Sequence, residues 1–522
     1  MFSEKLHRYI YLFSLILLGV AIPFSVFLMS VSQFLLAANW LLELDFRDKW
    51  QRLKQNKSAL FLIGLFVLHL LWMINSENWN YGLHDIKIKL PLLTLAILLG
   101  TSKPLLFSEL KLLLNFFILS ILSSSLISGL IYFDIIHRDI TDVRQISIFI
   151  SHIRLSLLVN IGFFSTYYLL GKTRDRYLKL FYIISLIWFP FFLFILNAYT
   201  GLFIFIIVFV IILVRYLIQT SRLWLKISSF SILLILLLSG FYTAYDIFNR
   251  FTFKEILPQE SSLERYTING NKYHHNLKAK QMENGYLVYT YICNKELKEE
   301  WDKRSDISFK NGLNEKGNPV RFTLLNYLTS LNLRKDSVGI AQLSEEDIRL
   351  IEEGYSNYIY KDKYSIYAKV YPLLKQISFY NTSNYAEGAS VSQRFEYLKI
   401  AGRIIKNNFW LGVGTGDVDD AFKKHYANGE SRLSQKYQHR AHNQYVTFFL
   451  TFGIFGFLVS LFFIFAPIFI NKMNYLALVF ILVASLSMLN EDTLETQAGI
   501  TFFTYFYILF FVISPNSKEL NS

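Results

Sequence analysis

The chain has 522 residues and a formal net charge of +13; 53% of its residues are hydrophobic and only 17% are charged. Soluble domains carry about 25% charged residues, so this composition excludes a soluble enzyme, a disordered scaffold and a disulfide-rich secreted module. Membrane proteins collect Lys and Arg in their cytoplasmic loops, so the positive charge does not indicate a nucleic-acid partner. The sequence predicts an all-α polytopic membrane protein.

Apolar segments predict about twelve transmembrane helices, since a spanning helix needs about 20 apolar residues. The segments lie near residues 9–29, 31–45, 59–75, 89–101, 109–133, 153–171, 177–197, 199–218, 224–246, 444–471, 474–490 and 498–514. The second, fourth and eleventh are short. A cleaved signal peptide is an alternative for the first segment, but the long apolar run and the spans that follow favour a signal anchor.

Basic residues alternate from one connection to the next. Residues 47–57 contain five Lys and Arg and residues 172–179 contain four, whereas residues 197–201 carry no charge. Basic loops face the cytoplasm. With twelve spans, this pattern places both termini in the cytoplasm.

One polar stretch interrupts the pattern and defines three predicted domains. Residues 1–247 hold helices 1–9, residues 248–443 form a large loop domain, and residues 444–522 hold helices 10–12 with a cytoplasmic tail. A stretch of this length is too long for a simple connection. Segments 343–353 and 393–407 have helical periodicity, so we expect a mostly helical domain outside the cytoplasm.

Charged residues at the outer ends of spans are candidates for function, because a charge near a membrane segment is costly. Arg154 opens the sixth segment, and Lys87 and Lys89 lie at the outer start of the fourth. Snorkelling to the headgroups is the alternative for the lysines. Arg394 begins an amphipathic segment of the large loop, where a solvated helix face is the alternative.

The run Gly412-Val413-Gly414-Thr415-Gly416-Asp417 looks like a glycine-rich phosphate loop. A lone motif of this kind is weak evidence, and the run follows a predicted helix rather than a strand. We therefore predict a tight turn that redirects the chain. The sequence has no HExxH motif and no paired cysteines, so we expect no metal site.

The end of the large loop carries the most specific pattern. It reads Arg440-Ala441-His442-Asn443, followed by a span that contains Gly453 and Gly456. A histidine at the outer membrane face can act as a general base near neutral pH. The alternative is a structural histidine at the membrane interface.

This pattern resembles the signature of the O-antigen ligase family. That signature is His, then Asn, Ser or Gln, nine residues, Gly, two residues, and Gly, Thr or Tyr. His442, Asn443, Gly453 and Gly456 match all four positions. About twelve spans, with a large periplasmic loop between the ninth and tenth, are also similar to the family. The resemblance says little about residues 250–390.

The resemblance implies a metal-independent, inverting glycosyltransferase of the bacterial inner membrane, without a cofactor and with its active site facing the periplasm. The donor would be a glycan on undecaprenyl pyrophosphate and the acceptor lipid A-core, with His442 as the catalytic base. Arg154 and Arg394 match arginine positions that the family uses for the diphosphate. Arg440, Lys87 and Lys89 are added to the diphosphate site from their location alone. We expect a monomer.

Several alternatives remain open at this point. An O-antigen polymerase shares the donor, and a protein O-oligosaccharyltransferase shares the histidine motif but differs in its acceptor. A transporter of lipid-linked sugars would carry charges and helix breaks in repeated halves, and no matching halves are found. Five tyrosines of the loop either stack on sugar rings or pack a loop core: Tyr355, Tyr358, Tyr360, Tyr364 and Tyr367.

Overall fold

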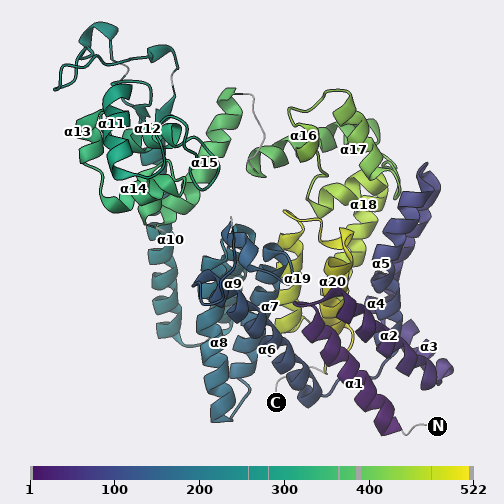
Figure 1. Ribbon diagram of the computed structural model, residues 1–522. Coiled ribbons are helices and arrows are strands. Elements are labelled where there is room, and N and C mark those ends of the chain that lie inside the picture. The colour runs from purple at the N-terminus through teal and green to yellow at the C-terminus, as the bar shows by residue number, and fades with distance from the viewer. Residues whose placement is uncertain are drawn as a thin grey trace. The chain divides into compact units, whose positions relative to one another are not determined.

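The computed structural model describes residues 4–140, 142–256, 258–279, 281–362, 365–383, 390–471 and 473–515. These residues form helices and one short β-hairpin, which confirms the all-α prediction. The chain divides into two compact units: the first joins Met1–Gln219 to Ala386–Ser522, and the second is Thr220–Tyr385 (Figure 1). The predicted boundaries near residues 248 and 443 stay a prediction.

The first unit is a bundle of long apolar helices with a smaller polar part formed by α16 and α17. Its elements are α1 (Glu4–Ala21), α2 (Val26–Leu42), α3 (Phe46–Gln55), α4 (Lys57–Leu71), η1 (Trp72–Asn75), α5 (Trp79–Gly100), α6 (Phe107–Tyr132), η2 (Val143–Ile146), α7 (His152–Leu170), α8 (Arg176–Ile195), α9 (Tyr199–Gln219), α16 (Ser390–Asn407), α17 (Val418–Ala427), η6 (Gln435–Tyr437), α18 (Gln444–Ile470), α19 (Tyr475–Ser487), η7 (Thr493–Glu495) and α20 (Gln497–Phe511).

The second unit joins one long apolar helix to a polar helical part with its own core. Its elements are α10 (Leu223–Thr252), η3 (Glu260–Ser262), η4 (Leu277–Ala279), β1 (Met282–Glu283), β2 (Tyr286–Leu287), α11 (Asn294–Arg304), α12 (Val320–Ser330), α13 (Ser337–Ala341), α14 (Glu345–Glu352), η5 (Tyr358–Lys361) and α15 (Ile366–Ser383). Trp301, Leu324, Leu328 and Ile351 lie in this core and are fully buried.

The structure contains a helix at each of the twelve predicted apolar segments. Within the described residues, seven helices are long and apolar enough to cross a membrane, or eight if the bent pair α2–α3 counts as one span. The others fall short because α19 and α20 have only 13 and 15 residues and because α1 and the N-terminal half of α5 carry charges. The protein is thus a multi-pass membrane protein, and the count of twelve stays a prediction.

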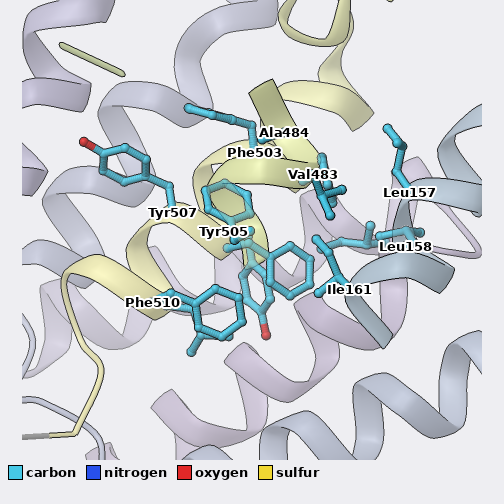
Figure 2. Packing of buried hydrophobic residues seen from close by; sticks show 14 of the residues in the cluster. Leu157, Leu158, Ile161, Val483, Ala484, Phe503, Tyr505, Tyr507 and Phe510 are labelled. Carbon is cyan, nitrogen blue, oxygen red and sulfur yellow. The ribbon is translucent and has the colours of Figure 1, made fainter. Parts of the chain in front are cut away.

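Helix α20 is the centre of the first unit. It packs against α2, α4, α5 and α19, and Ala498–Phe510 are buried throughout. Figure 2 shows aromatic side chains of α20 beside Leu157 and Ile161 of α7 and Val483 of α19. The hydroxyl of Tyr505 donates a hydrogen bond of 3.1 Å to the Leu15 carbonyl. A helix surrounded by protein can be shorter than a lipid-exposed span.

Helix α18 bends at Gly453, the first glycine of the family signature. This residue has φ 63° and ψ −170°, far from helical values. The chain at residues 409–414 crosses the bend: Ile454 N–H donates to the Phe409 carbonyl at 2.9 Å, and Val413 N–H donates to the Leu450 carbonyl at 2.8 Å. The exposed backbone at the bend thereby gains partners from the approaching segment.

Only glycine fits at this crossing. A Cβ on Gly453 would lie 2.3 Å from the carbonyl carbon of Trp410, and a Cβ on Gly412 would lie 2.4 Å from the Thr451 carbonyl oxygen. Gly412 also has a positive φ of 68°. The two glycines let two backbones come into direct contact, which places the loop that follows residue 412 against the start of α5.

We expect Gly453→Ala to destabilise the protein by about 2 kcal/mol or more. Positive φ with ψ near 180° is a region that almost only glycine adopts and costs another residue about 1–3 kcal/mol, and the clash with Trp410 adds strain to a packed site. Thermal unfolding of the purified protein would measure the change.

Gly402→Ala is the matched control, because Gly402 lies in α16 and a Cβ there would meet no atom within 4 Å. Alanine is the better helix former by about 1 kcal/mol, so this variant should be as stable as the wild type or more so. Equal unfolding temperatures for the two variants would contradict the account of the bend.

Candidate active site

The connection between α19 and α20 carries three carboxylates and is tied to the start of α18. We call residues 488–496 the acidic connection. Gln444 N–H donates to the Met488 carbonyl at 2.9 Å, and the Gln444 side-chain oxygen accepts from Leu494 N–H at 2.7 Å. The Asn443 amide donates to the Leu489 carbonyl at 2.7 Å and also caps α18. The two segments therefore act as one rigid piece.

A cavity lined mostly by polar residues lies next to the acidic connection and the residues before α18. It encloses about 1410 Å³, including space open to solvent. Its lining residues are Tyr81, Arg154, Asp419, Phe422, Lys423, Tyr426, Gln435, Gln438, His439, Arg440, His442, Glu491, Asp492, Glu495 and Thr496. The structure thus brings three predicted site residues, Arg154, Arg440 and His442, to one cavity from segments far apart in the chain.

His442 lies at the point where the chain turns into α18. Its φ is 49°, a left-handed value uncommon outside glycine, and its side chain is 43% exposed. The imidazole Nδ1 lies 4.0 Å from Oδ2 of Asp492, and the ring lies 5.8 Å from the ring of Tyr397. The backbone strain and these two neighbours hold the imidazole at the cavity wall.

Burial lowers the pKa of His442 below its ordinary value. The Asp492 carboxylate acts in the opposite direction, while Arg394 and Arg440 lower the pKa further. Burial raises the pKa of Asp492, which accepts a hydrogen bond of 2.9 Å from the Thr447 hydroxyl. His442 is consequently the neutral imidazole near pH 7, the form that can accept a proton.

Arg440 lines the cavity, and its guanidinium group is surrounded by oxygen atoms. Its guanidinium donates to the Tyr81 hydroxyl at 3.4 Å and lies 3.6 Å from Glu495 and 3.7 Å from Asp419. Burial alone would lower the pKa of Arg440, but the carboxylates, Glu495 first, outweigh it and raise that pKa. The side chain is a fixed cation at the cavity wall.

Two further arginines contact the acidic connection. Arg154 donates a hydrogen bond of 2.7 Å to the Thr496 hydroxyl and lines the cavity. Arg394 donates to the Asn490 side chain and lies 3.5 Å from Glu491. Arg394 is outside the cavity lining, so it reaches the site through Glu491.

The two predicted lysines have different surroundings. Lys89 is 1% exposed and pairs with Asp85 at 2.6 Å and with Glu495 at 3.0 Å. Lys87 is exposed and is not among the residues that line the cavity. This geometry makes Lys89 a buried support beneath Glu495, and it leaves both lysines without direct access to a ligand in the cavity.

The glycine-rich run at 412–417 forms a turn, as predicted. Each of its six backbone N–H groups donates to a protein acceptor, at N···O distances between 2.8 and 3.5 Å. The Asp417 carboxylate accepts from the N–H groups of Glu77 and Asn78 at 2.7 and 2.8 Å. A phosphate would need those N–H groups to be free, so the run fastens the loop to the start of α5 instead.

Glu491, Asp492 and Glu495 are site residues that were not predicted from the sequence. Three carboxylates within five residues, between two apolar segments, were the available signal. Buried acids need partners, and the cations that pair with Glu491 and Glu495, namely Arg394, Arg440 and Lys89, are among the predicted site residues.

The geometry defines a class: a multi-pass, all-α membrane protein with a cavity that joins arginines, carboxylates and a neutral histidine. Residues 363–461 match a family model described as O-antigen ligase. This match confirms the resemblance over that part of the chain. The matched residues include Arg394, His442, Gly453 and Gly456, whereas Arg154 and the acidic connection lie outside them. No curated protein matches the chain.

We expect Asp492→Asn to lower the pKa of His442 further. The carboxylate raises that pKa by its charge, so a neutral amide removes the effect and the imidazole loses its proton at a lower pH. Histidine NMR of the labelled protein across a pH series would measure the shift.

Asp419→Asn is the control, because Asp419 pairs with Arg440 and is not among the groups with the largest effects on the pKa of His442. An unchanged His442 pKa in Asp492→Asn, or an equal shift in both variants, would contradict the pairing.

Proposed function

We propose that the protein is an O-antigen ligase-like glycosyltransferase. It would move a glycan from undecaprenyl pyrophosphate to a hydroxyl of lipid A-core, at the periplasmic face of the bacterial inner membrane. One observation carries the proposal: the histidine of the family signature shares a cavity with Arg154 and Arg440.

In this proposal His442 is the general base. Its Nδ1 lies on the side of Asp492, which leaves Nε2 for the acceptor hydroxyl. As the acceptor oxygen bonds to the anomeric carbon, its proton passes to Nε2 and the bond from that carbon to the pyrophosphate oxygen breaks. A single displacement of this kind inverts the anomeric centre. Undecaprenyl pyrophosphate departs with the bonding electron pair.

Arginines would stabilise the leaving group. Guanidinium groups bind phosphate oxygens through two hydrogen bonds at once, and fixed cations at the site of developing charge lower the barrier without reorganisation. Arg154 and Arg440 line the cavity. Arg394 pairs with Glu491 and so offsets the negative charge of that carboxylate at the cavity wall. The proposal needs no metal ion and no cofactor, because the donor's pyrophosphate bond supplies the energy.

The apolar helices suit the polyprenyl tail of the donor. We propose that both termini lie in the cytoplasm, because the basic connections would then face inward, and that residues 248–443 lie in the periplasm. We further propose that a monomer is sufficient, because His442, Arg154 and Arg440 come from one chain.

We expect the purified protein, in EDTA, to transfer glycan from undecaprenyl pyrophosphate to lipid A-core, and His442→Ala to lower the rate about 10²–10⁴-fold, the usual contribution of a general base. Gel separation of the products would measure transfer. The wild type should lose activity as the pH falls through the lowered pKa of His442, because the protonated imidazole cannot accept a proton.

His425→Ala is the control, because His425 pairs with Glu430 and does not line the cavity. Longer lipid-linked glycan without modified lipid A-core would replace the ligase with a polymerase. Transfer to a peptide alone would indicate a protein O-oligosaccharyltransferase, and no transfer at all would favour a transporter.

We expect Arg154→Lys to fail nearly as badly as Arg154→Ala. A lysine keeps the charge but loses the two-pronged contact with phosphate oxygens. Initial rates of the three proteins in the same assay would decide. A fully active lysine variant would show that Arg154 acts as a simple charge, and the assignment to bidentate phosphate binding would be wrong.

A further inference from the structure

The second unit contains a cavity that the proposed function does not use. It encloses about 1020 Å³, including space open to solvent, and lies where the end of α10, the β1–β2 hairpin, the end of α12 and η5 meet. Its lining residues are Arg250, Phe253, Asn284, Tyr286, Ser330, Leu331, Asn332, Tyr358 and Tyr367. Four of these nine residues are aromatic, which is unusual for a wall that faces water.

A tight hairpin fixes one side of this cavity. Asn284 and Gly285 form its turn with φ values of 48° and 86°, the pattern of the Asn-Gly hairpin turn. A Cβ on Gly285 would lie 2.3 Å from the Phe253 carbonyl oxygen, so the turn rests directly on the chain after α10. The rings of Phe253 and Tyr286 lie 5.7 Å apart as a result.

A buried hydrogen-bond network supports the hairpin from below. Glu283 is 1% exposed and accepts from the Asn357 amide at 2.7 Å, the Tyr371 hydroxyl at 2.8 Å and the Lys375 ammonium at 2.6 Å. Asn357 also donates to the Asn284 side chain at 2.9 Å. A satisfied buried network of this kind rigidifies its surroundings, so the cavity is pre-formed.

Several polar groups on the wall remain available. Among the described residues, the hydroxyls of Tyr286, Tyr358 and Tyr367 and the amide of Asn332 have no hydrogen-bond partner. The Tyr358 side chain is 40% exposed and Phe253 is 49% exposed. Flat apolar faces thus stand next to unused donors and acceptors.

The sequence could not show which of the five tyrosines of the loop pack a core and which could contact a sugar. The structure gives the surroundings of four of them. Tyr355 packs against the core of the second unit under the Lys316 ammonium, 3.5 Å from its ring centre. Tyr360 packs against the cluster of Ile359 and Tyr371. Tyr367 lines the cavity but also packs against this cluster, and its ring lies 5.8 Å from the Arg250 guanidinium. Tyr358 lines the cavity, and Tyr364 lies outside the described residues.

We propose that this cavity binds a pyranose-containing glycan. The C–H face of a pyranose ring packs on aromatic side chains, and its hydroxyls bond to groups such as tyrosine hydroxyls and asparagine amides. Arg250 pairs with Asp246 at 2.9 Å, so the wall offers no unpaired positive charge, and neutral sugars fit better than acidic ones. The proposal rests on the proposed function for the origin of the glycan, and adds a binding site distinct from the cavity at His442.

The test measures binding rather than transfer. Lipid-free glycans would be released by mild acid from the lipopolysaccharide and lipid-linked pools of the source cells. Their affinity for the full-length protein would be measured by saturation-transfer NMR and calorimetry, in a detergent without a sugar headgroup, which would otherwise compete. We expect Tyr358→Ala to lower the affinity about tenfold, a loss of about 1.4 kcal/mol.

A second variant keeps the backbone intact. Asn332 has φ 56°, so Asn332→Gly removes the amide at a position that glycine prefers, and we expect it to weaken binding several-fold with unchanged thermal unfolding. Tyr266→Ala is the control, because Tyr266 is 61% exposed in the same unit and does not line the cavity. It should bind as the wild type does.

The outcomes separate this proposal from the previous one. His442→Ala should bind glycan normally even where transfer is lost. No binding by the wild type, or equal affinity of Tyr358→Ala, Asn332→Gly and the wild type, would overturn the proposal, as would a preference for acidic over neutral glycans. Binding that Tyr358→Ala weakens, in a protein that transfers no glycan, would uphold the cavity and reject the ligase.

Discussion

The site depends on a buried ammonium group. Lys89 is 1% exposed, and among the described residues its ammonium pairs with Asp85 and Glu495. Removing one partner of such a group leaves an uncompensated buried charge, which costs about 3–5 kcal/mol. Because Glu495 also accepts from Gln444 and faces Arg440, one ion cluster fixes α5, the start of α18 and the acidic connection. The position of His442 follows from that arrangement.

Much of this structure could be predicted from the sequence. Long apolar runs predict its helices, and four residues at fixed spacing match the family signature. Hydropathy located α18 and α20, and His442 was identified from the spacing to Gly453 and Gly456. The partners of His442 could not be found in this way. Asp492 lies fifty residues further along the chain, and only packing brings the two together. Periodicity describes one helix at a time and carries no information about such contacts.

The lysines show the same limit on a smaller scale. Lys87 and Lys89 are two positions apart, and a helix turns about 100° per residue, so the two side chains point about 200° apart. One is therefore exposed and the other buried between carboxylates. Their shared location at the outer end of a span suggested one role for both. The choice between them depends on which face of α5 meets the acidic connection.

The order in which the cavity's walls occur along the chain has a consequence for biogenesis. Arg154 is translated before residues 419–442, and Glu491–Thr496 follow both. A nascent chain that ends before the acidic connection has neither Glu495, which faces Arg440, nor the Thr496 hydroxyl, which accepts a hydrogen bond from Arg154. Synthesis must therefore pass residue 496 before every wall of the cavity is present, and a chain that stops earlier lacks these contacts of Arg154 and Arg440.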